Sequence, residues 1–195
     1  MTPADLGHWY GPHLTPANRA WVEERRTGHL RTVAIAIGQV PRRLGNALLP
    51  NPAGPWPRGW RIDQTVRLDL ATSLTEADLA EVFATADVEE LIALYQGLSL
   101  LPGDQTRRAA EGVRSNMTAV FNAVALDNPY PAAHLDDGAF NQLTLKAVFT
   151  GADLERIHGL QARWNPDLQR MLSDLVRERT AAGRPIDPRV LALLG

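Results

Sequence analysis

The sequence contains no cysteine among its 195 residues. Disulfide bonds, thiolate nucleophiles and cysteine-ligated zinc or iron–sulfur centres are therefore excluded. Lysine is almost absent as well, because arginine supplies 19 of the 20 basic residues and Lys146 is the only lysine. With 22 acidic residues the formal net charge is −2. This balance indicates neither a nucleic-acid-binding surface nor a polybasic patch for a membrane.

Long apolar runs are also missing. The longest, residues 32–40, falls far short of the ~20 residues that cross a bilayer. Residues 1–10 lack the basic and apolar segments of a signal peptide. We therefore expect a cytoplasmic protein without membrane insertion. Its 45% apolar and 22% charged residues are typical of a globular chain.

The apolar residues that are present recur at helical spacing along most of the chain. Helix-capping patterns such as Thr15-Pro16, Thr75-Glu-Ala-Asp78 and Asp87-Val-Glu-Glu90 divide them into segments. One long helix is expected over residues 105–126. Residues 32–37 also alternate and are β-branched, but no partner strand is nearby, so a helix ending around Gly45 is preferred. The sequence predicts an all-α fold of eight or nine helices, as an antiparallel bundle or a short α-solenoid-like stack.

The expected domain organisation is simple. Residues 1–14 form an irregular leader, and residues 15–195 form a single helical domain. Within it, residues 50–60 hold four prolines and two glycines, which exclude regular structure. The two tryptophans of this loop, Trp56 and Trp60, are expected to pack onto the body.

No phosphate-binding loop, nucleophile elbow or zinc-binding helix motif is present. The five histidines are scattered, so no metal or other cofactor is expected. Polar residues instead gather between positions 114 and 149, beside positions expected to be buried. Asparagine is a poor helix former, so those within the helices need partners.

Two interpretations of this segment remain open. In the functional one, it lines a polar pocket between helices, with Lys146 as anion clamp, acid–base group or Schiff-base amine. His134 and Asp136 then form an acid–base pair, and the ligand is held by Arg114, Asn116, Asn128, Tyr130, Asn141 and Gln142. In the structural one, Asn128 caps a turn, His134 and Asp136 bond the main chain, and Lys146 pairs with Asp137.

Several of these stretches resemble the EboA-domain family. They are residues 114–131, which end in Asn-Pro-Tyr-Pro, and residues 140–149, which include Asn-Gln-x-x-Leu-Lys. Asn165-Pro166 and the Ala-Gly-Arg-Pro sequence at 182–185 resemble it too, and the likeness is clear from about Asp78 onward. The resemblance implies a small helical protein encoded in a bacterial gene cluster that processes or exports a secondary-metabolite precursor.

Two functions are compatible with this resemblance. The first is an accessory protein of natural-product biosynthesis or export that binds a small organic intermediate in the polar pocket. The alternative is a cofactor-independent cyclase, isomerase or lyase that uses Lys146, His134 and Asp136. Other proteins of the same cluster are possible partners, and nucleic acid is not expected as one.

Overall fold

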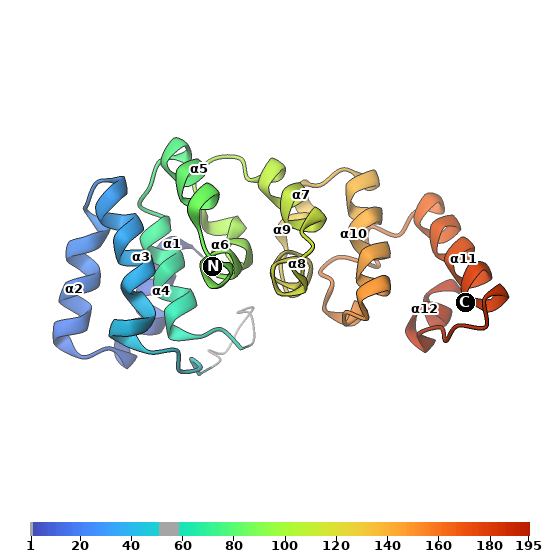
Figure 1. Ribbon diagram of the computed structural model, residues 1–195, viewed down its shortest axis with the longest axis horizontal. Helices are drawn as coiled ribbons and strands as arrows, with labels where there is room; N and C mark the ends of the chain where they lie inside the picture. Colours follow the sequence, from blue (N-terminus) through green and yellow to red (C-terminus); the bar gives the residue numbers. More distant parts are fainter. Residues whose placement is uncertain (1, 51–58) are drawn as a thin grey trace. The chain divides into compact units, whose positions relative to one another are not determined.

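A computed structural model describes residues 2–50 and 59–195 of the chain (Figure 1). The chain divides into two compact units, residues 1–107 and 108–195, where the sequence predicted one domain after a leader. Every element within the described residues is helical apart from an isolated antiparallel bridge between Leu48 and Arg61. The all-α prediction is therefore confirmed, with twelve α-helices in these residues in place of eight or nine.

The first unit is built around one buried helix. Its α-helices are α1 (Pro3–Tyr10), α2 (Pro16–Arg26), α3 (Leu30–Leu44), α4 (Ile62–Ala71), α5 (Glu76–Thr85) and α6 (Val88–Gln96). All ten residues of α4 are buried, and it packs against α1, α2, α3 and α6. Figure 1 shows α4 between α3 and α6. Trp60, just before α4, is 2% exposed and contacts Trp9 with ring centroids 5.9 Å apart.

The predicted caps begin their helices as expected. Thr15 accepts a hydrogen bond from the Asn18 amide at 3.2 Å. Thr75 and Asp87 each form a capping box with an acidic residue three positions on. These side chains satisfy amides that have no partner within the helix, which fixes where α2, α5 and α6 start.

The second unit surrounds α10. Its elements are α7 (Thr106–Arg114), which spans the boundary, α8 (Thr118–Ala125), α9 (Tyr130–His134), α10 (Asp137–Thr150), the 3-10 helix η3 (Leu154–Arg156), α11 (Pro166–Ala181) and α12 (Pro188–Leu194). α10 packs against α8, α11 and η3, and α12 packs against α11. The core side of α10 is formed by Phe140, Leu143 and Ala147, which are almost fully buried.

Two sequence predictions are wrong. The expected irregular leader contains α1, because Thr2 and Asp5 form a capping box with Pro3 at the first helical position. The single helix expected over 105–126 is broken into α7 and α8. The Ser115 hydroxyl accepts a hydrogen bond from the Met117 amide at 3.2 Å, and such local bonding competes with helix continuation. The preferred helix over residues 30–45 is confirmed as α3.

The loop expected over residues 50–60 lies mostly outside the described residues, and so does Trp56. At its ends the Leu49 amide donates to the Trp60 carbonyl at 2.9 Å, and the Ile62 amide donates to that of Ala47 at 2.9 Å. These two bonds bring the flanking segments together. Trp60 packs onto the first unit as predicted.

Candidate functional site

The only lysine closes the junction between α7 and α8. The Lys146 Nζ donates to the Val113 and Ser115 carbonyl oxygens, each at 2.6 Å, and lies 4.8 Å from the Phe121 ring centroid. Carbonyls at a helix end have no partner within the helix, and a cation there also complements the helix dipole. Burial lowers the pKa of the amine, whereas the two carbonyl oxygens favour its charged form. The described bonds of Lys146 are therefore those of a capping residue.

The Asn-Pro-Tyr-Pro segment is held by Asn128. Its Nδ2 donates to the Ala123 carbonyl at 3.1 Å, and its Oδ1 accepts from the Tyr130 amide at 3.0 Å. Asn128 is only 2% exposed, so these bonds satisfy a side-chain amide that water cannot reach. The same turn places the Tyr130 ring against the His134 ring, with the ring centroids 4.0 Å apart.

The second buried amide belongs to a different group. Asn141 and Asn165 exchange two hydrogen bonds of 3.1 and 3.0 Å between their side chains. The Asn165 Oδ1 also accepts from the Leu168 amide at 2.9 Å, so the pair joins α10 to the start of α11. Asp136, by comparison, caps α10 by accepting from the Ala139 amide at 2.7 Å.

The remaining predicted site residues are on the surface. Arg114, Asn116 and Gln142 are exposed, as are His134 and Asp136. The bonds described above do not bring the predicted residues to a common partner. These bonds therefore do not show the predicted residues meeting in one polar pocket. The roles of these residues in ligand binding or catalysis stay predictions.

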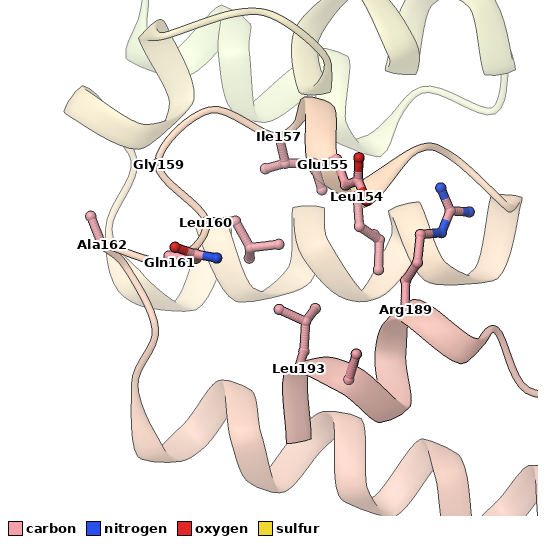
Figure 2. A pocket seen from close by; sticks show the side chains of 10 residues that line it. Leu154, Glu155, Ile157, Gly159, Leu160, Gln161, Ala162, Arg189 and Leu193 are labelled. Carbon is pink, nitrogen blue, oxygen red and sulfur yellow. The ribbon is translucent and has the colours of Figure 1, made fainter. Parts of the chain in front are cut away.

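A cavity of about 630 Å³ lies elsewhere in the second unit, between residues 154–162 and α12. Leu154, Leu160 and Leu193 extend into its middle, with Arg189 at one end and Gln161 at the other (Figure 2). We call it the leucine cavity. Its remaining lining residues are Glu155, Ile157, Gly159, Ala162 and Ala192. Its volume is within the range of small-molecule sites.

The leucine cavity forms because the chain between α10 and α11 is irregular. The only helical element between them is the three-residue 3-10 helix η3. The Asp153 side chain bonds the Glu155 amide at 3.2 Å, a local bond that starts this short turn. Leu154, Ile157 and Leu160 are spaced by three, which was the available signal that this loop has an apolar side.

The charge of the leucine cavity is set around Arg189. Its guanidinium donates to both Asp187 oxygens at 2.7–3.2 Å and to Asp153 at 2.8 Å. The Asp187 partner raises the pKa of Arg189, and Arg189 lowers that of Asp187. Glu155 is a further carboxylate on the lining, so one arginine and three carboxylates lie on or beside this cavity. This end of the cavity therefore disfavours an anion.

Sequence reasoning missed the polar residues of α4. Asp63 lies within 3.0 Å of Arg61 and 3.4 Å of Arg67, and Asp69 accepts from the Tyr10 hydroxyl at 2.7 Å. Burial raises the pKa of Asp69, and burial beside Asp69 raises that of Tyr10. The signal was the pattern of residues 62–71, where charged and apolar residues occupy every side of a short helix.

Neither unit shows features of a metal site or a membrane span in the part of the chain that the structure describes. No three His, Asp or Glu side chains gather there at metal-binding spacing. No described helix combines the length and hydropathy needed to cross a bilayer.

Comparison with known proteins gives one finding. The family described as "Metabolite traffic protein EboA" matches residues 4–195. No curated protein and no solved structure matches the chain. Because the match covers both units, this chain belongs to the EboA family.

Proposed function

We propose that this protein is a cytoplasmic carrier that holds a small, uncharged, largely hydrocarbon metabolite in the leucine cavity. The family description names metabolite traffic, and traffic requires a place to hold the molecule. The bacterial gene clusters that the resemblance implies suggest a natural-product intermediate as cargo. The observation that carries the proposal is the leucine-lined cavity beside α12.

The lining supports an apolar cargo with a polar end. Leu154, Leu160 and Leu193 supply apolar surface, and burying such surface contributes ~25 cal/mol per Å². Gln161 offers a neutral donor and acceptor. The carboxylates around Arg189 would repel an anionic cargo.

The same lining favours a role in binding the metabolite over a role in covalent catalysis. Among its ten residues there is no serine, threonine, lysine, histidine or tyrosine. Nucleophilic catalysis needs such a side chain, or an acidic one activated for attack. Glu155 is exposed, and the Arg189 guanidinium already donates hydrogen bonds to Asp153 and Asp187.

The test is binding of N-phenyl-1-naphthylamine, an uncharged probe that fluoresces in apolar surroundings. Ala192→Phe extends an exposed lining residue into the cavity and should weaken binding by about tenfold, or ~1.4 kcal/mol. Leu191→Phe is the matched control, because it adds the same ring one position away on α12, outside the lining. It should leave affinity unchanged.

Two results would reject the proposal. One is equal weakening by both variants, which would point to a general disturbance of α12. The other is unchanged binding in Ala192→Phe, which would place the probe elsewhere.

A further inference from the structure

A second cavity, of about 540 Å³, lies in the same unit on different residues. It is formed by the end of α10, by α11 and by residues 185–190. We call it the Phe149 cavity. It shares no lining residue with the leucine cavity, although both touch α12, here through Pro188 and Val190.

Its wall is apolar and includes an exposed aromatic ring. Val148, Leu175, Val176 and Ile186 line it, and Phe149 is 55% exposed. Exposed phenylalanine is unfavourable in water. A ring left at the edge of a cavity is available to stack on a planar molecule.

The cavity also contains a cation without a carboxylate partner. The Arg179 guanidinium lies 5.7 Å from the Phe149 ring centroid, and its Nη1 donates to the Pro185 carbonyl at 3.0 Å. Within residues 2–50 and 59–195 it forms no ion pair. Arginine has five N–H donors in a planar fork, so most of this fork is open to an acceptor.

The one acidic residue of the lining does not neutralise Arg179. Asp187 accepts the Arg189 amide and guanidinium, with both of its oxygens in use. Among the described residues, Arg179 therefore remains the cation of this lining that is available to an anion.

We propose that the Phe149 cavity binds a planar aromatic carboxylate as a second ligand. The carboxylate accepts paired hydrogen bonds from Arg179, which is the geometry that a guanidinium favours. The ring stacks beside Phe149 and packs against Val148 and Val176. This site is separate from the proposed cargo site, and it selects an anion where that site selects an uncharged molecule.

The experiment compares 2-naphthoate with 2-naphthamide by calorimetry on the full chain. The two probes have the same outline and differ in charge. We expect naphthoate to bind about tenfold more tightly, and added salt to weaken only naphthoate. Arg179→Met should abolish the preference, because it removes the charge and keeps an unbranched side chain. Arg179→Lys should retain part of it, since it keeps the charge and loses the fork.

Arg177→Met is the matched control. Arg177 lies on the same helix, is 77% exposed and is paired with Asp174. Its loss should not change either affinity. Methyl NMR shifts caused by naphthoate should fall on Val148, Val176 and Ile186. Phe149→Leu, a substitution at an exposed position, should weaken naphthoate several-fold and serves if Arg179→Met fails to fold.

The proposal is overturned by absence of naphthoate binding at millimolar concentration or by equal affinity for the two probes. It is also overturned if Arg179→Met and Arg177→Met behave alike, or if the shifts fall on Leu154 and Leu160. The first three of these results leave neutral-probe binding in the leucine cavity untouched, so the two proposals can fail separately.

Discussion

Replacing Lys146 with methionine tests whether its amine stabilises the α7–α8 junction. Methionine keeps most of the apolar stem and removes the charge and both hydrogen bonds to Val113 and Ser115. A hydrogen bond from a charged donor contributes ~1.5–3 kcal/mol when buried. An exposed ionic contact contributes less than ~1 kcal/mol.

Lys146 is half-buried, so in the variant water can partly replace its bonds to the two carbonyl oxygens. We therefore expect the two bonds together to contribute about 2 kcal/mol, near the lower bound for a single buried one. Lys146→Arg should recover part of this, because a guanidinium also donates to carbonyls at a helix end. Lys146→Ala should cost more than methionine, since it also removes the stem.

The free energy of unfolding is measured by urea titration, and amide hydrogen exchange in α7 and α8 gives the local change. Gln142→Ala is the control, one turn earlier on α10 and exposed, and should change stability by less than ~0.5 kcal/mol. If Lys146→Met is as stable as the control while ligand binding is lost, the capping account is wrong. The sequence-based prediction of a functional amine would then be favoured.

Three further substitutions test the packing and the buried charges. Asp69→Asn should change how the free energy of unfolding depends on pH, because burial raises the pKa of Asp69 above its ordinary 3.8. As pH falls through that raised pKa, the folded wild type takes up a proton before the unfolded chain does and so gains stability relative to the variant. Parallel pH profiles of the two proteins would contradict this. Asn141→Ala should destabilise the second unit by ~1–3 kcal/mol, because it leaves the half-buried Asn165 amide without its partner, and a neutral effect in urea titration would refute the pairing. Gly97→Ala should cost ~1–3 kcal/mol, because the added methyl would overlap the buried Leu68 side chain. A melting temperature equal to that of the wild type would contradict this.

Most of the fold that the sequence predicts correctly comes from helix-capping patterns. Thr15, Thr75 and Asp87 each accept a hydrogen bond from an amide at the start of the expected helix, because this chemistry depends only on neighbouring residues. The same pattern is present at Thr2-Pro3, where it begins α1 in the segment predicted to be irregular. The break at Ser115 depends on one local bond that helical spacing does not reveal.

The candidate site was harder to predict because partners lie far apart in the chain. Spacing placed Lys146 beside a core position correctly, but its acceptors lie 31 and 33 residues away. Asn141 likewise bonds Asn165, 24 positions on. The leucine cavity depends on a loop that stays irregular beside a short terminal helix, and no motif marks such a gap.

The most direct test of the carrier account is methyl NMR of the full chain with N-phenyl-1-naphthylamine. The account predicts contacts between the probe and the methyl groups of Leu154, Leu160 and Leu193, and their loss in Ala192→Phe. Contacts confined to methyl groups outside the leucine cavity, such as those of Val148 and Val176, would contradict it.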